Sequence, residues 1–479
     1  MAKTNIVFVG GNASYIHCAF ASMCLKASLK ELEDSATIIE TEVRETTPLQ
    51  FFERLVALSP SVILLSTYLW NRDFFVAVCK LCHEIIPDVP IIAGGPQLVP
   101  YDEAEPLKKH VDIIIYGEGE GVIYDAVKLA LSGKANIPSA PYEIFAEPTD
   151  LSKVKLPYYL YEDKDIANRV VYVEATRGCP FSCEYCTSAG SGGIRYFPLE
   201  ALKKEFLTLI NRGVIHFKFL DRSFNHGGEH SLALLDFFRE NYRDGMTLHF
   251  EFTPEEPSDE WRQRLCAFPP KTLHLEVGIQ TWEPDIAARI KRPLNREKTT
   301  KTLKFLIEEA KADVHADLII GLPGEGISTI ASGFNFLIGL NPAELQVGIL
   351  KLLPGTAIHR HIEEFELKFS PDPPFEVLST RDICFNELRR MERFAKCFDV
   401  MYNRGRFNLS SRLYIFSENT PFEQIMRVAD HLYSKYGRLH ALSPKSIAAA
   451  MQELIMPSRL QELRVALETD ARESKHQQF

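Results

Sequence analysis

Short apolar runs rich in β-branched residues alternate with amphipathic segments along most of the chain, and this alternation is the strongest constraint on its fold. In the first 130 residues the apolar runs predict buried parallel strands at 5–10, 36–40, 61–66, 89–95 and 111–120. Amphipathic segments at 18–32, 72–86 and 120–132 predict helices between them. This order is typical of a five-stranded, doubly wound α/β domain with flavodoxin-like strand order.

A second series of strands follows residues 136–168, a segment rich in Pro, Tyr and charge that we interpret as a linker. Six βα units in a row predict a partial (β/α)6 barrel related to the TIM barrel, with its working face at the carboxyl ends of the strands. The predicted strands are 170–175, 214–221, 247–252, 272–280, 314–324 and 344–355, and the predicted helices are 198–212, 229–242, 258–267, 296–312 and 325–338.

From about residue 370 the pattern becomes helical, notably at 381–407 and 421–439. We therefore expect an α/β chain with three domains, at 1–135, 169–365 and 366–479, joined through the linker at 136–168.

Composition excludes several classes of function. The 54 Lys and Arg against 64 Asp and Glu give a net charge of -10, which argues against a surface that coats nucleic acid or binds an anionic membrane. No apolar run is long enough to span a bilayer, and the first residues do not resemble a signal peptide. Ten cysteines are too sparse for a disulfide framework, so we expect a cytoplasmic protein whose cysteines are thiols or metal thiolates.

Three of these cysteines lie together in EATRGCPFSCEYCTS, directly after the predicted strand 170–175. Cys179, Cys183 and Cys186 have the spacing C-x3-C-x2-C. Three thiolates on one loop can bind three irons of a 4Fe-4S cluster and leave the fourth iron without a protein ligand. The alternative, a zinc knuckle, needs a fourth protein ligand nearby, and the next histidine, His216, lies in a predicted strand. We therefore predict that Cys179, Cys183 and Cys186 bind a cluster and are catalytic.

The loop resembles the cluster loop of the radical S-adenosylmethionine (SAM) enzymes, in which this cysteine motif follows the first strand of a partial barrel. The resemblance implies that SAM chelates the open iron and that its one-electron reduction yields a 5'-deoxyadenosyl radical. FLDRSFN (219–225) matches the segment that holds the methionine end of SAM, whereas EVGIQ (276–280) and GLPGE (321–325) match the strand ends near its ribose and adenine. The SAM-binding residues implied are Tyr185, Asp221, Asn225, Glu276, Gln280, Gly321 and Pro323.

The strand ends of the first domain carry GGNASYIH, STYLWN, GGP and GEGE. Their glycines allow a large flat ligand to approach the backbone, although glycine pairs are also ordinary turn chemistry. With the barrel, this domain resembles that of the cobalamin-dependent radical SAM enzymes, over roughly residues 1–360. The resemblance implies cobalamin contacts from Asn12, Tyr15, His17, Ser66, Thr67, Tyr68, Trp70, Asn71, Gly94, Gly95, Pro96, Gly117, Glu118, Gly119 and Glu120.

The D-x-H-x-x-G motif that supplies a cobalt ligand in cobalamin mutases is absent from the sequence. His17 is the alternative ligand, or else a hydrogen-bonding residue of its loop. We expect Tyr68, Trp70 and Asn71 to cover the lower face of the corrin, where an indole would leave cobalt without a lower ligand and favour four-coordinate Co(I). The alternative for Trp70 is core packing.

The expected activity is methylation of an unactivated carbon of a small-molecule or unidentified substrate, through methylcobalamin and a 5'-deoxyadenosyl radical. The resemblance also implies an electron donor such as flavodoxin or ferredoxin. Cobalamin-assisted cyclisation, ring contraction or other redox chemistry without methyl transfer is an alternative, and a cobalamin sensor with a structural cluster is an alternative of another class. The C-terminal region resembles a poorly characterised helical domain of some such proteins, and we expect it to close the barrel mouth or to bring Tyr402, Asn403 and Arg404 to the substrate.

Overall fold

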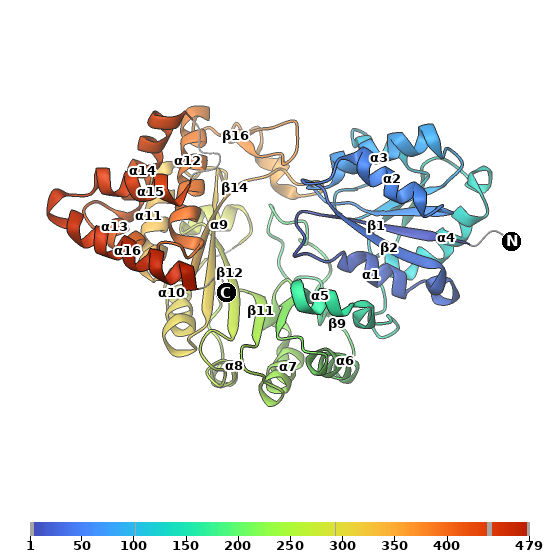
Figure 1. The fold of residues 1–479 in the computed structure, drawn as a ribbon, viewed down its shortest axis with the longest axis horizontal. Helices are drawn as coiled ribbons and strands as arrows, with labels where there is room; N and C mark the ends of the chain where they lie inside the picture. Colours follow the sequence, from blue (N-terminus) through green and yellow to red (C-terminus); the bar gives the residue numbers. More distant parts are fainter. Residues whose placement is uncertain (1–3, 101, 293, 438–442, 477–479) are drawn as a thin grey trace. The chain divides into compact units, whose positions relative to one another are not determined.

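The computed structural model describes residues 4–100, 102–292, 294–437 and 443–476 (Figure 1). The chain forms two compact units. Unit 1 comprises residues 1–180, 190–249 and 353–356, and unit 2 comprises 181–189, 250–352 and 357–479. The boundary passes through strand β11 (Thr247–Phe252) and through the loop that carries the three clustered cysteines.

The N-terminal sheet of unit 1 is parallel and has the strand order β2-β1-β3-β4-β5-β6, which confirms the flavodoxin-like order and adds one strand. Val7 and Val9 of β1 belong to the hydrophobic core on one face, and Ile6 and Phe8 to the core on the other, so helices cover both faces. The elements are β1 (Ile6–Asn12), α1 (Phe20–Ala27), β2 (Ala36–Glu42), α2 (Pro48–Ala57), β3 (Val62–Ser66), α3 (Arg72–Ile85), β4 (Ile91–Gly94), β5 (Ile113–Tyr116) and α4 (Ile123–Leu131).

The additional strand, β6 (Tyr142–Phe145), lies in the segment that we interpreted as a linker. It pairs with β5 in parallel, with Ile144 opposite Ile115. Helix α5 (Asp163–Asn168) lies in the same segment. Residues 136–168 are therefore partly built into the fold, and β6 escaped prediction because an edge strand of four half-buried or exposed residues has too weak a hydrophobic pattern.

The second sheet has the order β14-β13-β12-β11-β10-β7, and its described pairs are parallel (Figure 1). Each strand falls within a run predicted from the sequence, except that β13 begins one residue earlier, at Asp313, and this confirms the partial barrel. On β12 the alternate residues Leu273, Leu275, Val277 and Ile279 are buried, as expected for a strand with helices on one side. The elements are β7 (Val171–Val173), α6 (Leu199–Asn211), β10 (His216–Phe219), α7 (Gly228–Glu240), α8 (Asp259–Leu265), β12 (Leu273–Gln280), α9 (Pro284–Arg289), α10 (Arg296–Lys304), β13 (Asp313–Ile320), α11 (Ile327–Gly339) and β14 (Glu344–Ile349).

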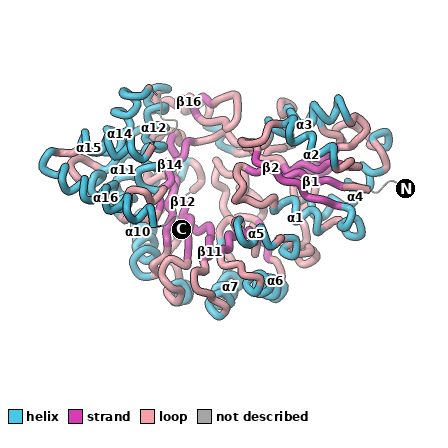
Figure 2. The backbone as a smooth tube through the Cα atoms, in the orientation of Figure 1, coloured by secondary structure: helices cyan, strands magenta, loops and turns pink. Residues whose placement is uncertain are grey.

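Beyond a short hairpin of β15 (Lys368–Phe369) and β16 (Val377–Ser379), the C-terminal region is helical, as Figure 2 shows in cyan. Its core continues that of unit 2, because Phe394 and Phe398 pack edge-to-face on Phe334 of α11. No described helix is long and apolar enough to cross a membrane. The helices are α12 (Phe385–Phe398), α13 (Asn408–Ile415), α14 (Pro421–Tyr436), α15 (Pro444–Leu454) and α16 (Leu460–His476).

Candidate functional site

The three clustered cysteines lie in the loop between two short strands, β8 (Thr176–Arg177) and β9 (Arg195–Tyr196). All three are free thiols, and each sulfur receives a polar contact. The Ser223 hydroxyl lies 3.9 Å from Cys179 Sγ, the Arg292 guanidinium 3.7 Å from Cys183 Sγ, and the Ser188 N–H 3.4 Å from Cys186 Sγ.

Within the described residues, no three His, Cys, Asp or Glu side chains converge as they do around a single metal ion. The donor chemistry of the loop nevertheless fits an iron-sulfur cluster. Thiolates are the usual protein ligands of such clusters, and hydrogen bonds to their sulfurs tune the reduction potential. Cys179, Cys183 and Cys186 each receive such a polar contact at the sulfur.

Glu184 anchors the middle of the cysteine loop within unit 2. Its carboxylate accepts hydrogen bonds from His361 at 2.6 Å and from Arg360, and it pairs with Lys291 at 3.3 Å. Its N–H donates to the carbonyl of Ile290 at 3.0 Å. Burial disfavours the charged carboxylate, but the His361 and Lys291 hydrogen bonds, together with the Arg360 charge, outweigh it and hold the pKa of Glu184 below its ordinary value.

Neither Glu184 nor Arg292 has a sequence signal that predicts its role. Besides its contact with Cys183, Arg292 donates a hydrogen bond to the Gly278 carbonyl of β12 at 2.6 Å. Its guanidinium also lies 5.9 Å from the ring of Phe181. An arginine after a short helix reads as a surface residue in the sequence, so only the tertiary contacts give it this position.

The residues predicted to bind SAM fall in both units, and two of them carry unusual backbone. Gln280 has φ +72 at a register shift between β12 and β13. Gly321 has φ +89 directly after β13, and a Cβ there would lie 2.6 Å from Val377. Glu276 lies on the same strand face as Gln280, and the Pro323 carbonyl accepts a hydrogen bond from Arg289 at 2.6 Å. Burial raises the pKa of Tyr185.

Asp221 has a different surrounding from the one that we expected. It is fully buried, and its two carboxylate oxygens accept hydrogen bonds from the Ala175 N–H at 3.0 Å and the Thr176 hydroxyl at 2.6 Å. Burial raises its pKa to about 7. Asp221 therefore supports the strand end before the cysteines, and its contact with SAM stays a prediction. Asn225 lies in a 3-10 turn, Phe224–His226, in the same unit.

The loop after β3 is held in one conformation by Asn71. The Asn71 amide donates to the carbonyls of Gly11 and Ser66 at 3.0 and 3.1 Å, and its oxygen accepts from the Tyr68 N–H at 2.8 Å. Trp70 donates its indole N–H to Gly11 at 2.9 Å and stacks on Tyr68 with ring centroids 4.5 Å apart. Trp70 is 49% exposed, so it is not a core residue and offers a flat aromatic surface at the carboxyl end of β3.

The loops after β3 and β4 are in close contact, and their shape and polar groups bear on whether a flat cofactor could bind there. A Cβ on Gly95 would lie 2.5 Å from the Thr67 carbonyl, and Gly95 has φ +112. Thr67 is fully buried, yet its hydroxyl has no hydrogen-bond partner in the part of the chain that the structure describes. A buried hydroxyl without a partner is costly unless a ligand supplies one. These loops therefore fit a cofactor with polar groups at its edge.

Replacing Gly95 with alanine is expected to lower the free energy of unfolding of the apoprotein by roughly 3 kcal/mol, because the methyl group meets backbone and φ is positive. Gly133→Ala is the control, since Gly133 has φ +101 but no atom within 4 Å of a Cβ. It should cost about 1 kcal/mol. Urea unfolding checks both values, and equal losses would contradict the steric argument.

His17 lies in the loop after β1, where it contacts the first strand of the second sheet. Its Nδ1 lies 2.6 Å from the Tyr172 hydroxyl, and its carbonyl accepts a hydrogen bond from Asn12 at 2.8 Å. Burial, followed by the charges of Lys218 and Arg169, lowers its pKa. These contacts fit the hydrogen-bonding role for His17. Tyr15, in the same loop, is half exposed, and the Arg169 guanidinium lies 4.6 Å from its ring centroid.

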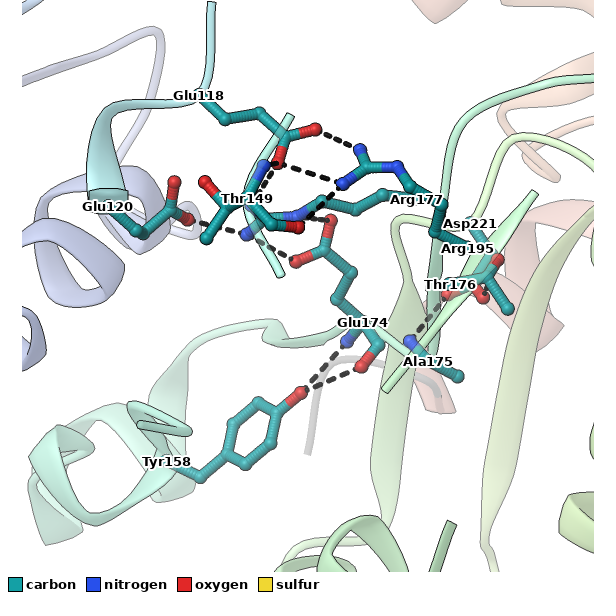
Figure 3. A network of polar contacts seen from close by, with 10 residues as sticks. All are labelled: Glu118, Glu120, Thr149, Tyr158, Glu174, Ala175, Thr176, Arg177, Arg195 and Asp221. Atoms are coloured by element: carbon teal, nitrogen blue, oxygen red, sulfur yellow. Dashed lines mark hydrogen bonds and ion pairs between the residues drawn. The ribbon is translucent and has the colours of Figure 1, made fainter. Parts of the chain in front are cut away.

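The loop after β5 supplies carboxylates to arginines. Glu118 and Glu120 pair with Arg177, and Glu118 also pairs with Arg195 (Figure 3). Their side chains therefore have protein partners, and the backbone around Gly117 and Gly119 is the part of this loop that remains suited to a cofactor.

Tyr402 and Asn403 do not reach the carboxyl ends of the barrel strands. The Tyr402 hydroxyl donates to the Pro342 carbonyl at 2.7 Å, and the Asn403 side chain bonds to both the N–H and the carbonyl of Leu345. Leu345 is the second residue of β14, so both side chains lie at its amino end. The expectation that they approach the substrate is wrong, and they instead cover the exposed edge of a sheet.

Three family models match successive parts of the chain. The B12 binding domain matches residues 6–127, the radical SAM superfamily matches 173–337, and a protein family of unknown function (DUF4080) matches 363–458. The first two matches, in this order on one chain, decide the family. This chain belongs to the cobalamin-dependent radical SAM enzymes. The cofactors of this family are a 4Fe-4S cluster, SAM and cobalamin.

Curated relatives of this cobalamin-dependent radical SAM protein include methyltransferases. The cobalamin-dependent radical SAM methyltransferase TokK of Streptomyces tokunonensis is 24% identical over 65% of this chain and 50% of its own. The 2-(S-pantetheinyl)-carbapenam-3-carboxylate methyltransferase of Streptantibioticus cattleyicolor is 28% identical over 30% of this chain and 25% of its own. The chain thus spans half or less of the length of these relatives.

Solved structures support the fold of the family. TsrM of Kitasatospora setae with cobalamin and a [4Fe-4S] cluster matches 99% of this chain and 100% of its own, with a TM-score of 0.63 and 15% identity. OxsB with aqua-cobalamin and S-adenosylmethionine matches 99% of this chain and 81% of its own, with a TM-score of 0.63 and 13% identity.

Proposed function

We propose that this cobalamin-dependent radical SAM protein is a methyltransferase that methylates an unactivated carbon of a small-molecule substrate. The similarity to TokK and to the carbapenam enzyme, both methyltransferases, supports methyl transfer. The main supporting observation is that one chain holds two features. One is a cysteine loop with a polar contact at every sulfur, and the other is the loop after β3, in which the half-exposed Trp70 stacks on Tyr68. When bound, the cluster would supply one-electron reduction of SAM, and cobalamin would supply methyl-carrying chemistry.

On the SAM side, Cys179, Cys183 and Cys186 hold the cluster in this proposal. Arg292 brings a permanent positive charge next to Cys183, which suits an anionic group such as the SAM carboxylate. Tyr185, Asp221, Asn225, Glu276, Gln280, Gly321 and Pro323 remain the further residues that we propose for SAM.

On the cobalamin side, the backbone of Gly94, Gly95, Pro96, Gly117 and Gly119 lets the macrocycle approach, and the Thr67 hydroxyl supplies a hydrogen bond. Trp70 and Tyr68 form a stacked aromatic surface against its lower face. His17 bonds to Tyr172 through Nδ1, and we propose a hydrogen-bonding role for it and a cobalt without a histidine ligand. A low-potential one-electron donor of the flavodoxin or ferredoxin class and a cytoplasmic location complete the proposal.

Radical chemistry without methyl transfer is the second candidate. It is favoured by the TM-score to OxsB, a cobalamin-dependent SAM radical enzyme, which at 0.63 equals the TM-score to TsrM.

The test uses protein reconstituted with iron, sulfide and hydroxocobalamin under anaerobic, reducing conditions, with SAM that carries a deuterated methyl group. S-adenosylhomocysteine together with label on cobalamin is the expected result. Deoxyadenosine without labelled cobalamin would replace the proposal with the second candidate. Neither product, despite full loading with cluster and cobalamin, would indicate a sensor whose cluster is structural.

A further inference from the structure

A partly buried network of ion pairs joins the loop after β5 to the segment that leads into the cysteine loop, and all of its members lie in unit 1 (Figure 3). Arg177 is its centre. Its guanidinium pairs with Glu120 at 2.6 Å, with Glu174 at 2.9 Å and with Glu118 at 3.3 Å. Arg195 completes it by pairing with Glu118 and donating to the Thr149 carbonyl at 2.8 Å.

The network differs from ordinary surface ion pairs by its burial. The side chain of Arg177 is 13% exposed, and those of Glu120 and Glu174 are 8% and 15% exposed. Exposed pairs restrain little because water competes for both partners. In a buried network, removal of one charge leaves its partners uncompensated, so each member keeps the others in place. Arg177 pairs with three carboxylates, one of which it shares with Arg195, so its position is strongly determined.

The chain from Arg177 to the first cysteine is short and stiff. Gly178 has φ +96, and a Cβ there would lie 2.0 Å from the Gly193 carbonyl, so the backbone is packed on backbone at this point. The Cys179 N–H then donates to the Ser191 hydroxyl at 2.9 Å. The backbone between Arg177 and Cys179 therefore has little conformational freedom, so the position of Arg177 constrains that of Cys179.

The other end of the network is equally constrained. Glu118 and Glu120 flank Gly119, directly after β5. Gly117 has φ +88, and a Cβ there would lie 2.7 Å from the Ala146 carbonyl. The Thr149 N–H donates to Glu118 at 3.0 Å. The carboxylates of Glu118 and Glu120 therefore both pair with arginines, while the loop backbone stays in one conformation.

We propose that Arg177 is a positioning residue that fixes the separation between Cys179 and the loop 117–121, and so between the cluster and cobalamin. The proposal rests on the cofactor sites given under the proposed function, but not on methyl transfer. A fixed spacing has a chemical purpose, because displacement of reacting groups by about 1 Å can cost roughly 100-fold in rate.

The experiment measures the spacing itself. Reconstituted protein with bound hydroxocobalamin is reduced so that cob(II)alamin and the reduced cluster are both paramagnetic, and their dipolar coupling gives a distribution of distances. Arg177→Gln is expected to broaden or shift this distribution relative to the wild type at equal iron and cobalamin content. Arg390→Lys, at the exposed Arg390–Asp430 pair of the helical region, is the control and should leave it unchanged.

Glu120→Gln keeps Arg177 and its contacts with Glu118 and Glu174. This variant is measured in place of Arg177→Gln if Arg177→Gln does not bind both cofactors. It should broaden the distribution by a smaller amount. A distribution that stays unchanged in every variant that loads would overturn the proposal. The measurement needs neither substrate nor methyl transfer, so a protein that fails to methylate cobalamin would refute the proposed function and leave this test intact.

Discussion

Replacement of Cys183 with alanine is expected to remove the 4Fe-4S cluster and to reduce SAM cleavage by more than about 100-fold. Loss of residues that merely support a metal ligand costs 10–100-fold in affinity or activity, so loss of a ligand should exceed that range. Two thiolates cannot hold a cluster that needs three. Iron and sulfide analysis, the EPR signal of the reduced cluster and deoxyadenosine release measure the effect.

Cobalamin affinity should survive this substitution within about twofold, since differences below that are under 0.5 kcal/mol. Cys183 belongs to unit 2, whereas the loops proposed for cobalamin belong to unit 1. Cys266→Ala is the matched control, because Cys266 is an exposed thiol outside the loop, and it should keep both cluster and activity. A Cys183→Ala protein that keeps a full cluster would contradict the assignment of this cysteine.

The sequence predicted the strands well wherever burial imposes a strict pattern. β12 alternates buried and half-buried residues along its length, and the aliphatic run of β3 is buried through Leu65. Such patterns follow from the faces of a sheet and need no knowledge of the neighbours. β6 has no comparable pattern, because as an edge strand it contributes no fully buried residue.

Site residues were predictable only where they belong to a local sequence motif. Cys179 and Gly95 stand in motifs that appear in the sequence, whereas Arg292 and Glu184 acquire their roles from residues distant in the chain. Tyr402 shows the converse, since its polar motif suggested a site and its hydroxyl in fact bonds to Pro342. The roles of charged side chains are the hardest to predict, because the sequence does not reveal which partner neutralises them.

Glu325 illustrates such a hidden environment, at the end of the motif GLPGE. It is 2% exposed, and one of its oxygens accepts a hydrogen bond from the Thr281 hydroxyl at 2.5 Å. The other oxygen has no hydrogen-bond partner among the described residues. Burial therefore raises the pKa of Glu325 to about 8; the Thr281 hydrogen bond opposes this rise, and the charge of Glu283 adds to it.

A carboxyl whose pKa is higher in the folded than in the unfolded state stabilises the fold fully only below its unfolded pKa of 4.5. As pH rises from there to about 8, the unfolded chain releases the proton while the folded protein retains it, so stability falls. A shift of this size corresponds to a loss on the order of 5 kcal/mol, because one pKa unit is about 1.4 kcal/mol. Above pH 8 both states are ionised, and the loss is complete.

Glu325→Gln removes this titration while it keeps an oxygen for Thr281, so the variant should be more stable than the wild type by roughly 5 kcal/mol at pH 9 and nearly equal to it at pH 5. Urea unfolding of both proteins at the two pH values gives the comparison, in which the other titrating groups cancel. Thr281→Val is the control, because it removes the hydrogen bond without removing the carboxyl, and its pH dependence should be at least as steep as that of the wild type. Parallel curves for Glu325→Gln and the wild type would mean that Glu325 is ionised inside the fold and has a partner there, since an unpaired buried carboxylate could not be held at so little cost.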